Sequence, residues 1–264
     1  MLFARINGVL LHYQLAGPEN APALVLANSL GTDARIWKAV AERLAGRYRI
    51  LSYDKRGHGL SDVAAGEYSL DDHLEDVLGL MDHVGMARAG FAGISIGGLI
   101  GQGLALRAPE RFVGMALCNT APKVGDAALW AQRMEAVRAG GTAAIADAIM
   151  ERWFSPRFQR EAPEALAGWR NMFLRCDRDG YAATCATLRD TDLSARIGSI
   201  ALPVLVVAGT QDRATPPELV RTCANAIPDA RFALIEGIGH IPSIEHPEAL
   251  ASLLDDFFTE VGHG

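Results

Sequence analysis

The chain has 264 residues, of which 50% are hydrophobic and 21% are charged, so its composition is that of a globular protein rather than a disordered one. Its formal net charge of −6 argues against nucleic acid or an anionic membrane as a partner. The N-terminal residues lack the charged start, apolar run and cleavage site of a secretory signal, and we therefore expect a cytoplasmic protein.

The first half of the chain alternates short apolar runs with segments whose apolar residues recur at helical spacing. The runs are typical of buried strands, and the spaced segments are typical of amphipathic helices. Strands are predicted at 9–16, 23–27, 49–53, 90–94 and 112–118, and helices at 34–44, 70–84 and 96–107. Such alternation predicts an α/β fold, with a mostly parallel sheet covered by helices on both faces.

The segment 89–106 carries no charge over eighteen residues and could be mistaken for a membrane-spanning helix. It contains six glycines and Gln102, however, and a sharp break near Ser95 fits it better than a continuous helix. We interpret it as a buried strand, a turn and a buried helix.

Strand patterns disappear after Asn119, and the following segment is rich in Ala, Arg, Glu, Trp and Met at helical spacing. The alternation resumes with strands at 204–208 and 231–235 and helices at 217–226 and 247–261. We therefore predict one α/β core domain, formed by residues 1–121 and 191–264, with an inserted helical lid at 122–190.

The sharpest motif is Gly93-Ile94-Ser95-Ile96-Gly97, which lies between a predicted strand and a predicted helix. A serine on such a tight turn exposes its hydroxyl, and its neighbours must be small because the strand and helix pass close together. The motif predicts Ser95 as a nucleophile. A serine hydroxyl needs a base to take its proton and a third group to orient that base.

The base is expected at the carboxyl end of a strand, where ligand and catalytic groups gather in open α/β sheets. His240 follows the strand 231–235 through a short glycine-containing loop and meets this condition. His246 is the nearest rival, but it stands against Pro247 and is interpreted as a helix-entry residue. We therefore assign the role of base to His240.

The acid is expected between the serine and the histidine in the chain. Asp212 follows the strand 204–208 and again lies at a carboxyl strand end, whereas Asp190 and Asp192 precede that strand and are interpreted as surface or capping residues. The order Ser95, Asp212, His240 is the order expected for this type of sheet.

Two backbone N–H groups are needed to stabilise the oxyanion that forms during acyl transfer. We assign one to Ile96, at the start of the helix after the nucleophile, and one to Leu30, in the loop after the strand 23–27, where Gly31 permits close approach. The loop Asp54-Lys55-Arg56-Gly57-His58-Gly59 is interpreted as a compact structural turn. No cofactor and no metal are expected, because the sequence has no HExxH, P-loop, dinucleotide or CxxC motif.

The chain resembles the α/β-hydrolase superfamily over essentially its whole length and, more narrowly, the 3-oxoadipate enol-lactonases of aromatic-compound catabolism (the β-ketoadipate pathway). The strings that carry the narrower resemblance are Asn28-Ser29-Leu30-Gly31-Thr32-Asp33, Asp54-Lys55-Arg56-Gly57-His58-Gly59, Gly93-Ile94-Ser95-Ile96-Gly97-Gly98, Asn119-Thr120-Ala121, Gly209-Thr210-Gln211-Asp212 and Thr215-Pro216-Pro217. The resemblance implies a carboxylic-ester hydrolase that opens the enol-lactone to 3-oxoadipate through an acyl-enzyme on Ser95.

The substrate implied by this resemblance is a small anionic lactone, which calls for a cation in the pocket. The segment 122–190 has ten basic residues against nine acidic ones, which gives it a net charge of +1. Since the whole chain has a net charge of −6, the rest of the chain has −7. Arg133 and Trp153 are our candidates for substrate-binding residues of the lid, since a guanidinium can donate two parallel hydrogen bonds to a carboxylate.

Three alternatives stay open. The same triad serves carboxylesterases and cofactor-free haloperoxidases or perhydrolases, and a purely apolar lid pocket would favour them. A ligand-binding receptor on the same scaffold is a third alternative, because fold alone does not determine function. The sequence does not determine the oligomeric state, and a homo-oligomer is compatible with it.

Overall fold

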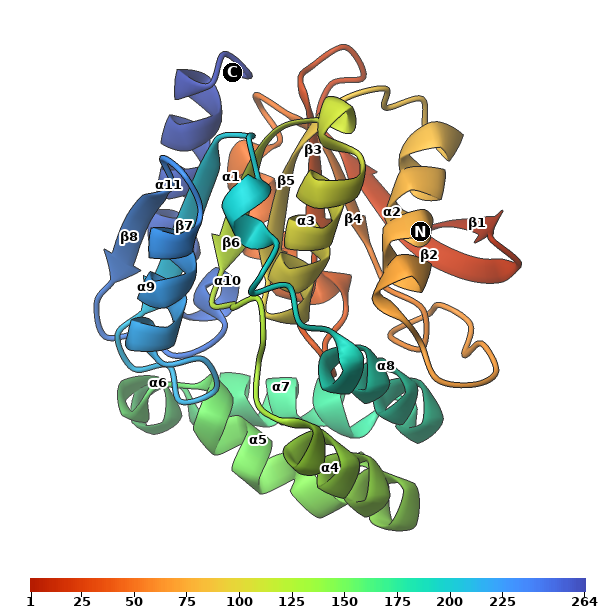
Figure 1. Cartoon of the computed structure of the whole chain (residues 1–264). Helices are drawn as coiled ribbons and strands as arrows, with labels where there is room; N and C mark the ends of the chain where they lie inside the picture. The colour runs from red at the N-terminus through yellow and green to blue at the C-terminus, as the bar shows by residue number, and fades with distance from the viewer.

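The computed structural model describes residues 1–264 and contains one eight-stranded sheet in the order β1-β2-β4-β3-β5-β6-β7-β8 (Figure 1). The strands are β1 Leu2–Ile6, β2 Val9–Ala16, β3 Ala23–Ala27, β4 Arg49–Tyr53, β5 Ala89–Ile94, β6 Phe112–Cys118, β7 Val204–Gly209 and β8 Arg231–Ile235. Only the pairings of β2 with β1 and with β4 are antiparallel. The predicted α/β fold with a mostly parallel sheet is therefore confirmed.

Helices cover both faces of the sheet. They are α1 Lys38–Leu44, α2 Leu70–His83, α3 Ile96–Arg107, α4 Ala127–Gly140, α5 Ala146–Trp153, α6 Pro156–Glu161, α7 Pro163–Leu174, α8 Arg178–Asp190, α9 Pro217–Ala226, α10 Pro242–Glu245 and α11 Pro247–Glu260. Two consecutive residues of β5 show the two faces: Gly90 packs against Phe258 of α11, and Phe91 packs against Gly101 of α3. The central strand is thus buried on both sides, as its uninterrupted apolar sequence requires.

The uncharged segment forms strand β5, a turn at Ser95 and helix α3, as predicted. None of the helices combines the length and the hydrophobicity that a membrane crossing requires.

Three details differ from the sequence prediction. The edge strand β1 was not predicted, because only two of its five residues are buried and its apolar pattern is weak. The helix predicted at 34–44 begins as a 3₁₀ turn, Ala34–Trp37, in which Asp33 accepts the N–H of Arg35. The four-residue helix α10 is too short to give a recognisable period.

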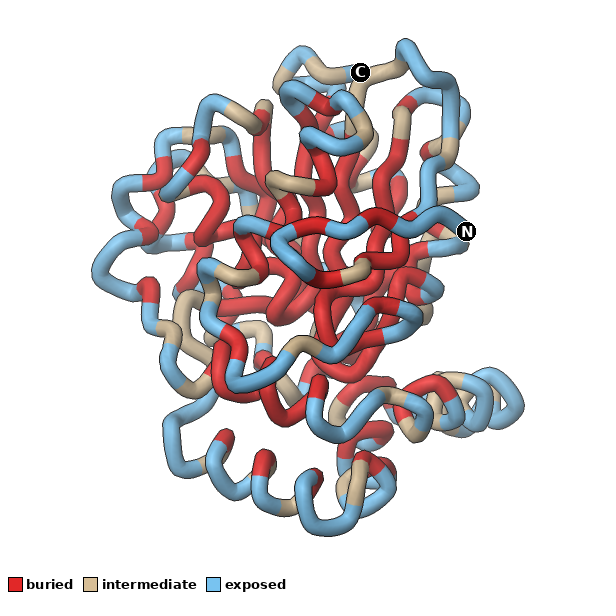
Figure 2. Tube along the Cα trace, turned by 90° about the vertical axis from the view of Figure 1, so that its right-hand side faces the viewer, coloured by how far each residue is buried: buried red, intermediate tan, exposed pale blue.

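The segment from α4 to α8 contains no strand, and its helices form a layer at one end of the sheet (Figure 1). We call residues 122–190 the helical insertion. Figure 2 shows that the buried residues are concentrated around the sheet, while much of the outer surface of the molecule is exposed. The insertion adds Trp130, Met134, Val137 and Trp153, among others, to the single cluster of 72 buried apolar residues. Insertion and sheet therefore share one hydrophobic core.

Candidate active site

Ser95 is held in a strained turn between β5 and α3. Its backbone has φ 59° and ψ −119°, a conformation that residues other than glycine rarely adopt. Neighbouring glycines make the turn possible: a Cβ on Gly97 would lie 2.3 Å from the Ala27 carbonyl oxygen, and a Cβ on Gly93 would lie 2.2 Å from the Gly97 carbonyl oxygen. The close passage of strand and helix that the motif predicts is therefore present, and it places Ser95 at the carboxyl end of β5.

Asp212 and His240 come from loops that follow β7 and β8 and lie side by side. Nδ1 of His240 is 2.8 Å from Oδ2 of Asp212, and both residues are almost completely buried. Four further hydrogen bonds hold the carboxylate. The Asn119 amide and the Thr215 hydroxyl each donate to Oδ2 at 2.7 Å, and the N–H groups of Ala214 and Thr215 donate to Oδ1.

These contacts keep Asp212 ionised. Burial by itself raises the pKa of the Asp212 carboxyl, but His240, Asn119 and Thr215 together outweigh burial and hold the pKa below its ordinary value. An ionised Asp212 can fix the tautomer of His240 and stabilise an imidazolium. Sequence reasoning assigned no role to Asn119, although it lies directly after β6 at the same edge of the sheet and has a positive φ of 49°.

Ser95 and His240 line one cavity of about 90 Å³ between the sheet and the helical insertion. No hydrogen bond joins the two side chains in this structure, and catalytic hydrogen bonds often form only with substrate bound. Core residues on the cavity wall are Ser29, Leu30, Ser95, Ala214, Thr215 and His240, and insertion residues are Val124, Gly125, Leu129, Trp130, Arg133, Ile149, Arg152, Trp153, Tyr181 and Leu188.

The loop after β3 carries Leu30, the predicted oxyanion donor, to the cavity wall. The N–H of Leu30 donates to no acceptor in the protein, whereas the N–H of Gly31 donates to Nε2 of His58 at 2.9 Å. Ile96 is the first residue of α3, where backbone N–H groups lack an intrahelical acceptor. The N–H groups of Leu30 and Ile96 thus have no acceptor within the protein.

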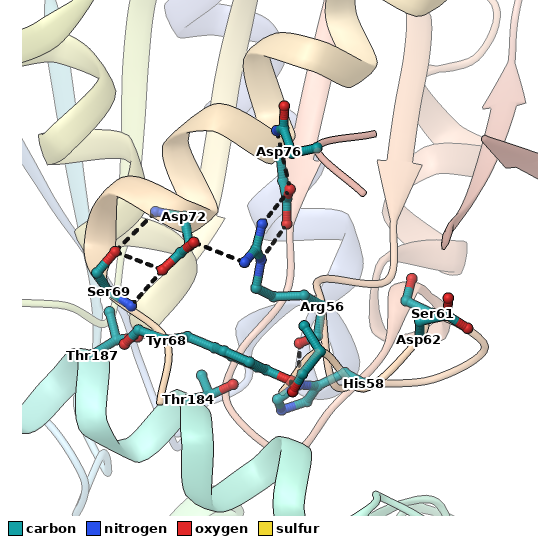
Figure 3. A network of polar contacts seen from close by, with 12 residues as sticks. Arg56, His58, Ser61, Asp62, Tyr68, Ser69, Asp72, Asp76, Thr184 and Thr187 are labelled. Atoms are coloured by element: carbon teal, nitrogen blue, oxygen red, sulfur yellow. Dashed lines mark hydrogen bonds and ion pairs between the residues drawn. The ribbon is translucent and has the colours of Figure 1, made fainter. Parts of the chain in front are cut away.

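The loop Asp54–Gly59 is bound to neighbouring elements by several buried polar contacts. Arg56 lies between two carboxylates of α2: its Nε and Nη2 atoms are each 2.7 Å from Asp76, and Nη1 is 2.9 Å from Asp72 (Figure 3). His58 is fully buried, and burial lowers its pKa well below the ordinary value, so the ring is neutral when it accepts the Gly31 N–H. The loop Asp54–Gly59 therefore supports the loop after β3 through the hydrogen bond between Gly31 and His58.

Both candidate substrate-binding residues, Arg133 and Trp153, line the cavity. Sequence reasoning missed a second arginine there, Arg152, which immediately precedes Trp153. Neither Arg133 nor Arg152 forms an ion pair, while the Arg133 guanidinium lies 4.9 Å from the ring centre of Trp130. Burial, and then the charge of Arg133, lower the pKa of Arg152. Asp212 and Tyr181 oppose this shift. Two cations without an ion-pair partner of their own therefore line a cavity whose other walls are mostly apolar.

The loop of His240 is bound directly to the helical insertion. The His240 N–H donates to the Trp153 carbonyl at 2.7 Å. The Glu245 carboxylate accepts hydrogen bonds from the Ser155 hydroxyl at 2.5 Å and from the Gly239 N–H at 2.8 Å. The junction of α5 and α6 thus supports the histidine loop from the side opposite the sheet.

The rejected candidates have the structural roles that were expected. His246 is the N-cap of α11, and its side chain accepts the Ala249 N–H. Asp190 ends α8 and pairs with Arg189, and Asp192 accepts the Ser194 N–H; both aspartates lie away from the cavity.

A serine at a strained strand–helix turn, with an Asp–His pair at the carboxyl ends of two other strands of the same mostly parallel sheet, defines the α/β-hydrolase class. The chain belongs to this class: the alpha/beta hydrolase family matches it over residues 24–253.

Similar proteins of known sequence or structure include enol-lactonases and an esterase. The chain is 36% identical to 3-oxoadipate enol-lactonase 2 of Acinetobacter baylyi, over 91% of this chain and 90% of that protein. The enol-lactonase of Burkholderia xenovorans LB400 has a similar structure, with a TM-score of 0.95 and 40% identity, over 98% of this chain and 100% of that one. A thermophilic esterase from Thermogutta terrifontis superposes with a TM-score of 0.93 at 26% identity, over 100% and 99% of the two chains. The protein is accordingly a hydrolase of ester or lactone bonds.

Proposed function

We propose that the protein opens 3-oxoadipate enol-lactone to 3-oxoadipate through a Ser95–His240–Asp212 triad. Ser95 Oγ attacks the lactone carbonyl carbon while His240 Nε2 takes the hydroxyl proton, and the N–H groups of Leu30 and Ile96 stabilise the tetrahedral oxyanion. Collapse breaks the bond to the ring oxygen, which leaves as an enol with the proton from His240. The enol rearranges to a ketone.

The second half of the reaction releases the acid. His240 takes a proton from water, the resulting hydroxide equivalent attacks the acyl-enzyme, and the same two N–H groups hold the second oxyanion. Ser95 regains its proton from His240 as the free carboxylic acid departs. Asp212 stabilises the imidazolium in both halves, and its lowered pKa keeps it ionised for that purpose.

The observation that carries the choice of substrate is the pair of guanidiniums without carboxylate partners in the cavity. Both guanidiniums are half-buried, and a bound carboxylate would give them the charge-assisted hydrogen bonds that no protein carboxylate supplies. A neutral ester gives Arg133 and Arg152 nothing to bind, whereas a lactone with a free carboxylate supplies the missing charge. We propose further that the helical insertion is the lid of this site and that Arg133, Arg152 and Trp153 recognise the substrate.

Two substrates and three kinds of variant test this function. Initial rates are measured on enzymatically generated 3-oxoadipate enol-lactone and on neutral p-nitrophenyl acetate. Ser95→Ala is expected to lower kcat by about 10⁴-fold or more on both substrates. Arg152→Met removes one charge-assisted contact, worth roughly 1.5–3 kcal/mol, so its kcat/KM on the lactone is expected to fall about 10- to 100-fold.

The matched control is Arg160→Met, because Arg160 is exposed, pairs with Glu161 and lies away from the cavity. On p-nitrophenyl acetate both arginine variants are expected to remain within about twofold of the wild type. Equal losses on both substrates in Arg152→Met would refute anion recognition. Better wild-type turnover of the neutral ester would support a carboxylesterase, and an active Ser95→Ala would refute the triad.

A further inference from the structure

Lys55 is a buried ammonium without a carboxylate partner. The residue is 1% exposed, and no Asp or Glu oxygen lies within 4.0 Å of Nζ. Its one hydrogen bond runs to the Ser29 carbonyl oxygen, at 2.5 Å. Burying a cation in this way is expensive for stability, so the residue requires an explanation beyond packing.

The Lys55 ammonium binds the peptide group whose N–H is the proposed oxyanion donor Leu30. The Ser29 carbonyl and the Leu30 N–H belong to the same amide group, and that N–H has no acceptor in the protein. Hydrogen bonds to one end of an amide polarise the other end, and a low dielectric strengthens the effect. A cation on the oxygen therefore makes the Leu30 N–H more positive and a stronger donor.

The loop does not need the ammonium to hold its shape. The Thr32 hydroxyl also donates to the Ser29 carbonyl, at 2.9 Å. The amide of Asn28 bonds to the Thr32 carbonyl, and His58 accepts the Gly31 N–H. The Ser29 oxygen would thus keep a partner if Lys55 were replaced.

We propose that Lys55 is a positioning residue for ester cleavage, whose ammonium polarises the Ser29–Leu30 peptide and strengthens the Leu30 N–H against the oxyanion. The inference rests on the oxyanion hole of the proposed function. Loss of an entire oxyanion donor lowers kcat by about 10²–10³-fold. Because the Leu30 N–H remains when Lys55 is replaced, the expected loss is smaller, about tenfold.

The charge of Lys55 responds to pH near neutrality. Burial lowers the pKa of Lys55 to about 7, and the carboxylates of Asp54 and Asp33 oppose the shift. His58 and His73 also face the ammonium and are neutral, because burial lowers the pKa of each. Cys176 is a neutral thiol whose pKa burial raises to about 12. The polarising charge is therefore complete well below pH 7 and is lost as the pH rises through that value.

The test compares Lys55→Met, which keeps the unbranched stem, with the wild type and with Lys38→Met. Lys38 is an exposed lysine of α1 that pairs with Glu42, so the control makes the same chemical change outside the site. The substrate is p-nitrophenyl acetate, whose neutrality removes any contribution from Arg133 and Arg152. Rates are measured from pH 6 to pH 9.5 after subtraction of the uncatalysed reaction, and thermal unfolding is followed in parallel.

Lys55→Met is expected to lose about tenfold in kcat at pH 6.5, with little change in KM and a Tm equal to or above that of the wild type. Wild type and Lys38→Met are expected to lose activity as the pH rises from 7 to 9, whereas Lys55→Met is not. A purely structural lysine would instead lower Tm and leave the shape of the pH profile unchanged, which would overturn the inference.

Two further results keep the test decisive. If Lys55→Met does not fold, the wild-type profile decides alone: a rate that does not fall between pH 7 and pH 9 refutes the role of the ammonium. If Lys55→Met equals the wild type while Ser95→Ala is inactive, this inference fails and the proposed triad stands. An active Ser95→Ala would overturn the proposed function, and with it the inference that depends on it.

Discussion

Gly97→Ala tests the close approach that holds the nucleophile. A Cβ at this position would lie 2.3 Å from the Ala27 carbonyl oxygen and 2.8 Å from its carbon, where ordinary contacts begin near 3.4 Å. The Cβ would thus lie about 1 Å too close to backbone atoms of β3, and no side-chain rotation can relieve such a clash. Either α3 or the loop that carries Leu30 must move by a similar distance.

The expected cost has two parts. Overpacking of this kind destabilises a protein by about 1–3 kcal/mol, which corresponds to a Tm lower by roughly 2–12 °C for a chain of this size. A displacement of about 1 Å between nucleophile and oxyanion donors is expected to lower kcat about 100-fold. Activity should therefore fall much further than stability alone would explain at 25 °C.

The assay is the kcat of p-nitrophenyl acetate hydrolysis together with a thermal unfolding curve. Gly168→Ala is the control, because Gly168 lies in α7 where an added Cβ would meet no atom within 4 Å, and alanine favours a helix by about 1 kcal/mol. That variant should keep full activity and a Tm at or above the wild type. A fully active Gly97→Ala with an unchanged Tm would show that the tight passage of strand and helix is not needed.

Two predictions concern buried charges. Arg56→Met leaves the buried Asp76 carboxylate with only a long contact to Asn7, so the free energy of unfolding in urea should fall by about 3–5 kcal/mol. The double variant Arg56→Met/Asp76→Leu should recover most of this loss. A double variant no more stable than the single one would contradict this account. Asp212 has a lowered pKa, so its ionisation stabilises the fold above about pH 4, and this contribution is lost as the pH falls through the folded-state pKa. The stability gap between wild type and Asp212→Asn should thus shrink between pH 5 and pH 3, and a gap independent of pH would argue against an ionised Asp212.

The sequence predicted those parts of the fold and site that depend on local pattern. The parallel strands were recognisable because each is a short apolar run, and the positions of Ser95, Asp212 and His240 followed from their places just after such runs. Ser95 and His240 meet at one cavity and Asp212 bonds to His240, because parallel strands end at the same edge of a sheet.

The parts that depend on helix packing were less accessible. Arg152 and Arg157 are five residues apart and chemically identical, yet only Arg152 lines the cavity, because the break between α5 and α6 turns the following residues away. Asn119 gave a similar difficulty. Its contact with Asp212 joins residues 93 positions apart and requires a left-handed backbone that no local periodicity reveals.

The bond between the Trp153 carbonyl and the His240 N–H has a consequence for recombining such enzymes. A chimera that exchanges the helical insertion for that of a relative also exchanges one of the supports of the general base. Specificity and turnover would then change together, even with every residue of the sheet retained. Breakpoints that keep Trp153, Ser155 and Glu245 from one parent should separate the two properties, whereas breakpoints that divide them should yield folded proteins with a misplaced imidazole.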